Sequence, residues 1–160
     1  MDLSTIQHRL FTLAQNVHPV GHARVMAAVV RKGKIISVAC NERKSDPRQA
    51  GYERECKCGH TRAVHNGEWG PCELCMCRDF SPRRIYRHAE MSAIKRAQRQ
   101  LGDLRGCVLV VARAKKVPIV ITSWDDRTQE KDGWAPGNSK PCSACQEYIK
   151  DVGIEEVCHT

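Results

Sequence analysis

Residues 107–114, "CVLVVARA", form a continuous apolar run of strand length. In a strand with one exposed face, polar and apolar side chains alternate, because successive side chains point to opposite sides of the sheet. A run that is apolar at nearly every position is typical of a central strand that is buried on both faces. We therefore expect a sheet with protein packed on both sides of this strand.

Helix and strand patterns alternate along the chain, which predicts an α/β fold. A helix is expected from Ser4, where Ser4 and Gln7 fit a capping box. Residues 24–41 contain two apolar, β-branched runs around Lys32-Gly33, the pattern of a β-hairpin. The inward face of the first helix would carry Ile6, Leu10, Leu13, Ala14 and Val17.

The second half of the chain continues this alternation. It predicts a helix over 88–102 that ends at Gly102, a further strand over 117–124, a polar loop over 125–140, a short helix over 141–153 and a last strand over 154–160. The polar loop contains Trp134, and Trp124 lies directly before it. A tryptophan in such a loop would either stack on a nucleic-acid base or simply anchor its loop.

Two short motifs carry the residues suited to chemistry. "HAE", residues 88–90, begins one helix, and "PCSAC", residues 141–145, begins another. Cys142 and Cys145 are three residues apart, so their sulfur atoms lie on one helix face, where the helix dipole stabilises thiolates. With His88 they make three zinc ligands, which leaves a fourth position open, as in catalytic zinc sites.

Glu90 lies two residues after His88, close enough to reach a water at such a site without binding the metal. A carboxylate in that place can take a proton from water and pass it to a leaving group. The alternative is a purely structural zinc site of His88, Cys142 and Cys145, with Glu90 on the surface.

The order of H-x-E and P-C-x-x-C resembles the zinc-dependent cytidine and deoxycytidylate deaminase superfamily. "HAEMSAI" and "KPCSACQEYIKDVGIEEV" are most similar to its deoxycytidylate deaminase branch, particularly phage-type members. The resemblance covers residues 20–41 and 86–160. It implies a three-layer α/β/α sandwich, a catalytic zinc held by His88, Cys142 and Cys145, and proton transfer by Glu90 during hydrolytic attack at C4 of cytosine.

The resemblance also implies substrate contacts. Asn41 matches the family asparagine that contacts the sugar, although an asparagine at a strand end is also an ordinary turn former. The Ala89 backbone would face the base. Ala27 and Val29 would either floor the pocket or belong to the core. Histidine as the first ligand, rather than the cysteine usual in free-nucleoside deaminases, favours the nucleotide, free-base or tRNA branches.

The expected substrate is dCMP, which would be converted to dUMP and ammonia. One alternative is a deaminase acting on single-stranded DNA or RNA. A second, from a different class, is a catalytically inactive zinc-binding nucleic-acid module. The presence of Glu90 beside a complete ligand set argues against the inactive module.

The segment 56–77 is dense in further metal ligands, within a region, residues 42–87, that has no apolar periodicity and interrupts the resemblance. We interpret it as a zinc-knuckle insertion in a single deaminase domain spanning 1–160, with at least one structural zinc. Which residues bind is left open. The candidate ligands are Cys56, Cys58, His60, His65, Cys72, Cys75 and Cys77.

Charge and composition limit the classes of binding partner that we expect. The formal net charge of +8 favours an anionic partner, although a basic surface without a particular partner would look the same. Residues 42–87 carry ten Lys/Arg against seven Asp/Glu, a weak basic footprint, so we expect a small nucleotide substrate ahead of nucleic acid. Candidate phosphate-binding residues are Arg24, Lys32, Lys34, Arg43, Lys44 and Lys140.

The cellular setting follows from what the sequence lacks. No apolar run approaches the roughly 20 residues of a membrane span, and the N-terminus has no signal-peptide pattern, so we expect a cytoplasmic protein. The resemblance to the deaminases implies in addition that the chain forms a homo-oligomer. In a reducing compartment the cysteines favour metal binding over disulfides. Cys40, Cys107 and Cys158 stand alone in apolar runs, which predicts buried thiols.

Overall fold

The computed structural model describes residues 2–20, 23–44, 74, 86–122 and 128–160. The chain divides into two compact units, one made of Met1–Glu42 with His88–Thr160, and one of Arg43–Arg87. Within the second unit, the N–H of Arg87 donates a hydrogen bond to the carbonyl of Lys44 (2.8 Å). The rest of the fold described below belongs to the first unit.

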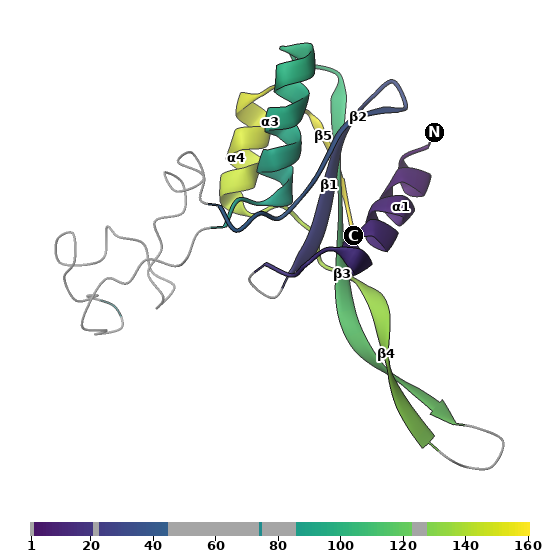
Figure 1. Ribbon diagram of the computed structural model, residues 1–160. Coiled ribbons are helices and arrows are strands. Elements are labelled where there is room, and N and C mark those ends of the chain that lie inside the picture. The colour runs from purple at the N-terminus through teal and green to yellow at the C-terminus, as the bar shows by residue number, and fades with distance from the viewer. Residues whose placement is uncertain (1, 21–22, 45–73, 75–85, 123–127) are drawn as a thin grey trace. The chain divides into compact units, whose positions relative to one another are not determined.

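A five-stranded sheet forms the centre of this unit (Figure 1). The main order of strands is β2-β1-β3-β4, and all of these neighbours are antiparallel. The last strand, β5, runs parallel to β3. The bounds are β1 Arg24–Arg31, β2 Lys34–Cys40, β3 Cys107–Thr122, β4 Thr128–Gly137 and β5 Glu156–His159.

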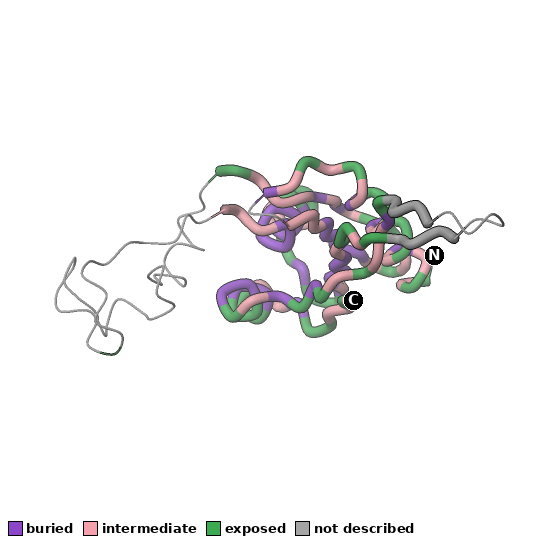
Figure 2. The backbone as a smooth tube through the Cα atoms, turned by 90° about the horizontal axis from the view of Figure 1, so that it is seen from below, coloured by how far each residue is buried: buried purple, intermediate pink, exposed green. Residues whose placement is uncertain are grey.

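Helices cover both faces of the sheet, which confirms the predicted three-layer α/β/α architecture. Helices α3 (Ala89–Leu101) and α4 (Ser143–Asp151) lie on one side, and α1 (Leu3–Asn16) lies on the other (Figure 1). In β3, Leu109 and Val111 belong to the core cluster of α3 and α4, while Val110 belongs to the cluster under α1. Figure 2 shows the buried positions gathered where the helices face the strands. The continuous apolar run is therefore explained by two separate cores.

The predicted hairpin is confirmed as β1 and β2. Its turn residues Lys32 and Gly33 have φ angles of 49° and 70°. Two consecutive positive φ angles are typical of the type I′ turn, whose twist matches that of the flanking strands. The hairpin brings Asn41, just after β2, to the same end of the sheet as the start of β1, because Met26 pairs with Cys40.

The first helix differs in detail from its prediction. Asp2, and not Ser4, caps it: Thr5 N–H donates to Asp2 Oδ1 (2.8 Å) and Thr5 Oγ1 donates to Asp2 Oδ2 (2.7 Å). These hydrogen bonds, the backbone one first, lower the pKa of Asp2 to about 2. Leu13 is 49% exposed because it lies at the edge of the apolar stripe formed by the buried residues Ile6, Leu10 and Ala14.

The region predicted as a strand followed by a polar loop is instead one long hairpin. β3 continues without a break to Thr122, and β4 returns beside it, with pairs from Thr122↔Thr128 to Arg113↔Gly137. Because β1 pairs only with residues 107–114 of β3, most of this hairpin is a two-stranded ribbon that projects beyond the sheet (Figure 1). The ladder joins backbone groups, so the polar sequence of β4 does not prevent it from pairing with β3.

Burial of the isolated cysteines follows the prediction only in part. Cys107 is 2% exposed, but Cys40 and Cys158 are partly exposed at the margin of the core under α1. Both lie on strands, β2 and β5, that pair with a single neighbour in the described sheet, so their outer sides are not covered by another strand. Among the described helices, none is both long enough and apolar enough to span a bilayer.

Candidate active site

The N-termini of two helices bring three metal-binding side chains together. His88 is the N-cap residue of α3, Cys142 is the N-cap residue of α4, and Cys145 lies in the first turn of α4. His88 Nδ1 is 3.5 Å from Cys142 Sγ and 3.3 Å from Cys145 Sγ. The three ligand atoms all lie within 4.8 Å of one another.

This donor set fits a tetrahedral zinc ion. Bonds of about 2.0–2.1 Å to nitrogen and 2.3 Å to sulfur, at tetrahedral angles, would separate the nitrogen from each sulfur by about 3.6 Å. The observed separations of 3.5 and 3.3 Å are close to that value. The position of both cysteines at the start of α4 also favours thiolates, because the helix dipole is positive there. Three protein donors leave one coordination position for another ligand.

Glu90 is the one buried carboxylate in the described part of the chain. It lies in the first turn of α3 and is 6% exposed. Burial raises the pKa of its carboxyl group, while a hydrogen bond to its own backbone and the nearby His88 act in the opposite direction. A carboxylate is rarely buried without a specific partner or purpose, because its charged form loses hydration. Its position beside His88 therefore indicates proton-transfer chemistry.

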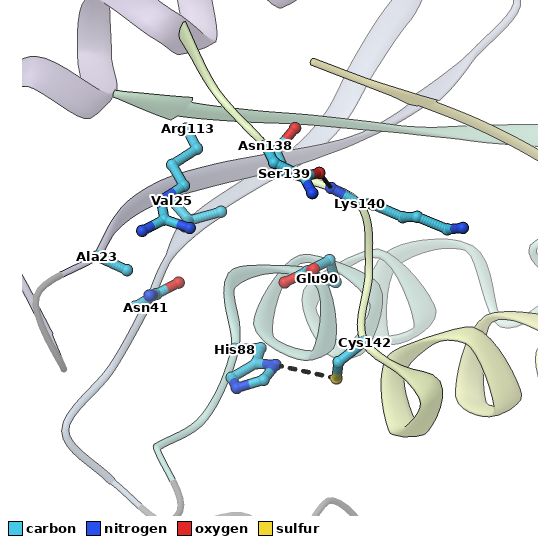
Figure 3. Close-up of a pocket in the computed structure, with 10 residues that line it drawn as sticks. All are labelled: Ala23, Val25, Asn41, His88, Glu90, Arg113, Asn138, Ser139, Lys140 and Cys142. Carbon is cyan, nitrogen blue, oxygen red and sulfur yellow. Dashed lines mark hydrogen bonds between the residues drawn. The ribbon is translucent and has the colours of Figure 1, made fainter. Parts of the chain in front are cut away.

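A cavity of about 160 Å³ lies beside these groups. Figure 3 shows His88 and Cys142 in the lower part of the view, Glu90 above them, and Arg113, Asn138, Ser139 and Lys140 at the top. The volume is smaller than the roughly 300–1,000 Å³ of most ligand pockets, and suits a single ring. The lining residues are Ala23, Val25, Asn41, His88, Glu90, Arg113, Asn138, Ser139, Lys140 and Cys142.

Asn41 is held in place by the start of α3. Its Oδ1 accepts a hydrogen bond from the N–H of Ala89 (3.2 Å). Because the oxygen is engaged in this way, the amide Nδ2 is the group that Asn41 can offer to a ligand in the cavity. Ala89 itself is fully buried, and its N–H is used in this contact.

The segment before α4 forms another wall. Ser139 is buried and donates a hydrogen bond from Oγ to the carbonyl of Val111 (3.0 Å). Thr160, after β5, donates from its N–H to Ser139 Oγ (2.8 Å) and from Oγ1 to the carbonyl of Gly137 (2.6 Å). The Lys140 N–H donates to Asn138 Oδ1 (3.0 Å). Strands β3 and β5 therefore position the wall that leads into Cys142.

Residues 2–160 match the model of a protein family described as "Cytidine and deoxycytidylate deaminase zinc-binding region". The chain belongs to this deaminase family. Its members are zinc-dependent, and the group of His88, Cys142 and Cys145 is where this chain has the matching donors. No curated protein matches the chain.

Solved structures of several deaminases are similar to this one. Guanine deaminase from Bacillus subtilis aligns with 100% of this chain and 64% of its own, at 17% identity and a TM-score of 0.47. The dCMP deaminase from cyanophage S-TIM5, in complex with dCMP and dUMP, aligns over 98% and 78% at 15% identity and a TM-score of 0.47. A tRNA:A34 deaminase aligns over 98% and 70% at 16% identity and a TM-score of 0.40. The chain thus spans less than two thirds of the guanine deaminase.

Sequence reasoning missed several residues of the deaminase cavity. Arg113 is the one charged residue within the apolar run 107–114, and this charge in an otherwise apolar segment was the signal for a special role. Asn138 and Ser139 directly precede the Pro-Cys motif, in a stretch predicted as a loop. Ala23 and Val25 line the cavity from the start of β1, whereas Ala27 and Val29 are fully buried core residues outside its lining.

The structure also separates the candidate phosphate-binding residues. Lys140 lines the cavity. Arg24 lies on the α1 side of the sheet, where it donates to the carbonyl of Gln15 (2.6 Å) and its guanidinium carbon lies 4.9 Å from the ring centre of Trp134. Lys32 and Lys34 are at the turn end of the hairpin, away from Ala23. Arg43 and Lys44 belong to the second unit.

Trp134 packs at the edge of the core under α1, on the face of the sheet opposite the cavity. It therefore anchors β4 and is not placed to stack on a substrate base. Trp124 lies outside the described residues. So do all seven candidate ligands of the predicted insertion site, namely Cys56, Cys58, His60, His65, Cys72, Cys75 and Cys77.

Proposed function

We propose that this deaminase hydrolyses the amino group of cytosine in a mononucleotide, converting dCMP and water into dUMP and ammonia. The observation that carries the proposal is the position of Glu90. A buried carboxylate lies in the same cavity as His88 and Cys142, within the first turn of α3. This is the arrangement that hydrolytic deamination requires: a proton carrier beside a site for a Lewis acid.

In the proposed site, His88, Cys142 and Cys145 hold the zinc ion. Zinc in such a site acts as a Lewis acid that lowers the pKa of water near neutral pH. Glu90 would take one proton from the attacking water and give it to the ring nitrogen next to C4, which keeps it. Glu90 would then take the second proton, that of the new C4 hydroxyl, and give it to the departing amino group. The C4–N bond breaks, a C4 carbonyl forms, and ammonia leaves with the transferred proton.

Residues in the walls of the cavity would orient the nucleotide. With its oxygen engaged by Ala89, Asn41 would donate from Nδ2 to a sugar oxygen. Val25 offers an apolar contact, and Ser139 keeps the opposite wall in place through Val111. The small volume supports entry of the pyrimidine ring alone, with the sugar at the mouth.

Two features favour a cytosine nucleotide among the substrates of this family. The "HAEMSAI" and "KPCSACQEYIKDVGIEEV" segments resemble the deoxycytidylate branch. The cavity lining also contains two cations, Arg113 and Lys140, against one carboxylate, Glu90. A site made of zinc, two thiolates and a neutral histidine adds no net charge, so the cavity is positive and suits an anionic substrate.

We also propose that residues 42–87 form an insertion that binds at least one structural zinc ion through ligands from the segment 56–77. The support is the spacing of its cysteines and histidines, together with a lack of apolar residues for a core of its own. Its role would be to stabilise this segment.

A substrate panel tests the proposed reaction. Purified zinc-loaded protein is given dCMP, CMP, deoxycytidine, cytosine, guanine, and single-stranded DNA and RNA containing cytosine or adenine, and ammonia release is measured. We expect dCMP to give the highest kcat/KM, and Glu90→Gln to abolish turnover. Preference for guanine or for an oligonucleotide would overturn the substrate, and equal turnover by Glu90→Gln would overturn the role of Glu90.

A further inference from the structure

Arg113 occupies an unusual place for a charged residue. It lies on β3, the central strand, where it pairs with Val25 of β1 on one side and with Gly137 of β4 on the other. Its side chain is on the same face as Val111, toward α3 and α4, and it is partly buried. A central strand normally carries apolar side chains at such positions, because a buried charge loses hydration.

The guanidinium group of Arg113 has no counter-ion in the described part of the chain. Other cations there do pair: Lys116 with Asp132 at 2.8 Å and Arg105 with Asp103 at 2.9 Å. No such contact involves Arg113 among the described residues. A partly buried cation without an anionic partner is disfavoured until an anion binds. Arg113 is therefore prepared for a ligand that brings negative charge.

Gly137 makes room for this side chain. A Cβ atom at position 137 would lie 3.1 Å from both Cγ and Cδ of Arg113, which is closer than ordinary contact. The φ angle of Gly137 is not positive, so its glycine is explained by space and not by backbone conformation. With no side chain on its β4 partner, the Cγ and Cδ atoms of Arg113 can lie close to the backbone of Gly137.

The two cationic side chains that line the cavity, those of Arg113 and Lys140, point in different directions. Figure 3 shows the guanidinium of Arg113 turned toward Ala23 and Asn41, on the side of the cavity opposite Cys142. The Lys140 side chain extends away from these residues in the same view. A ring placed beside Glu90 and His88 would direct its substituents past Asn41, toward Arg113. The cavity thus has one end formed by the metal-binding residues and Glu90, and another end formed by the guanidinium group of Arg113.

We propose that Arg113 is the phosphate-binding residue of the cavity and makes the site selective for a nucleotide over its nucleoside. The inference rests on the proposed function and adds to it the subsite that recognises the phosphate. A guanidinium group can bind two phosphate oxygens at once through parallel N–H groups, which an ammonium group cannot do. The intended ligand is the terminal phosphate of a mononucleotide, whose two ionisable oxygens suit this contact.

Arg113→Gln tests the subsite, and Arg99→Gln is the matched control. Both variants lose one positive charge, but Arg99 is exposed in the last turn of α3, far along the helix from Glu90. For each protein, kcat/KM is measured with dCMP, with deoxycytidine and with a cytosine-bearing single-stranded oligonucleotide. Loss of a charge-assisted contact predicts a fall of about 10- to 100-fold for dCMP in Arg113→Gln. Deoxycytidine should change less than about twofold, because it lacks the phosphate.

A binding measurement that needs no turnover accompanies the kinetics. Inorganic phosphate and dUMP are titrated calorimetrically into metal-free protein. We expect binding by wild type and Arg99→Gln, and loss of binding by Arg113→Gln.

The outcomes separate the two proposals. Equal losses for dCMP and deoxycytidine, or phosphate binding that survives Arg113→Gln, would overturn the subsite. An effect confined to the oligonucleotide would also overturn it, since the phosphate would then be that of a polynucleotide. Failure of wild type to deaminate any cytosine compound, with phosphate binding that depends on Arg113, would reject the proposed reaction and retain the anion subsite.

Discussion

Ser139 and Thr160 are joined by two reciprocal hydrogen bonds. The N–H of Ser139 donates to the carbonyl of Thr160 (3.0 Å), and the N–H of Thr160 donates to Ser139 Oγ (2.8 Å). Ser139 Oγ in turn donates to the carbonyl of Val111 on β3. A wall of the cavity is thereby tied to the central strand through a residue at the far end of the sequence.

Replacement of Ser139 by alanine should loosen this wall. Ser139 is 5% exposed, and its loss would leave the N–H of Thr160 and the carbonyl of Val111 without their partner. An unsatisfied buried polar group lowers the free energy of unfolding by about 1–3 kcal/mol. Chemical denaturation measures this loss, and steady-state kinetics should show a higher KM for dCMP. An unchanged unfolding midpoint would contradict the bracing role of Ser139.

Substitution of Glu90 by glutamine should separate activity from stability. Removal of the proton carrier predicts a fall in kcat of at least about 10²- to 10⁴-fold. The free energy of unfolding of the metal-free protein should not decrease, because burial already disfavours the charged carboxylate and the neutral amide has nearly the same shape. Ammonia release and denaturant titration are measured on the same preparations. A large loss of stability would instead indicate a structural role for Glu90.

The zinc content should fall in separate steps when the two predicted sites are altered. Cys142→Ser and His88→Ala should each remove the catalytic ion together with activity. Cys72→Ser, in the insertion, should reduce zinc content without altering the donors of the cavity. Elemental analysis per chain measures this, and we expect about two ions in the wild type. One ion per chain in the wild type would contradict the proposed zinc site of the insertion. Full zinc occupancy in Cys142→Ser would show that Cys142 is not a ligand.

The Asp2 cap predicts a pH-dependent contribution to stability. Its pKa is about 2 in the folded protein, below the ordinary value of 3.8, because Thr5 donates hydrogen bonds to the ionised carboxylate. The cap therefore stabilises the fold fully above about pH 4 and loses this effect as the pH falls toward 2. The difference in Tm between metal-free wild type and Asp2→Ala should shrink over that interval. Asp2→Asn, which accepts the same hydrogen bond without titrating, should differ from Asp2→Ala by a constant amount.

Gly137→Ala should act on the substrate through Arg113. The added methyl group would press on the Arg113 stem and displace its guanidinium group. We expect a higher KM for dCMP and an unchanged KM for deoxycytidine, with a smaller effect than that of Arg113→Gln. In the double variant, Gly137→Ala should add nothing further, because both changes act on one contact. Additive effects would show that Gly137 matters for another reason.

Local patterns were sufficient for the elements whose signals are contained in a few adjacent residues. The turn at Lys32-Gly33, the helix end at Gly102 and the paired cysteines of "PCSAC" depend on backbone preference and on spacing along one helix. The apolar run in β3 likewise required cover on both faces, whatever provided it. His88 and Glu90 could be proposed as a pair because two residues at a helix start are necessarily close.

Contacts between residues distant in the sequence determined the features that local patterns did not predict. The polar segment 128–137 became β4 because β3 offered it a ladder of backbone hydrogen bonds, which do not depend on side-chain polarity. Leu13 became exposed because the packing surface ended beside it. Arg113, Asn41 and Ser139 meet in one cavity only because three strands converge on the starts of α3 and α4. Sequence alone therefore determined the family, the core strand and the reactive groups, whereas the surroundings that would select a substrate arose from contacts between residues distant in the chain.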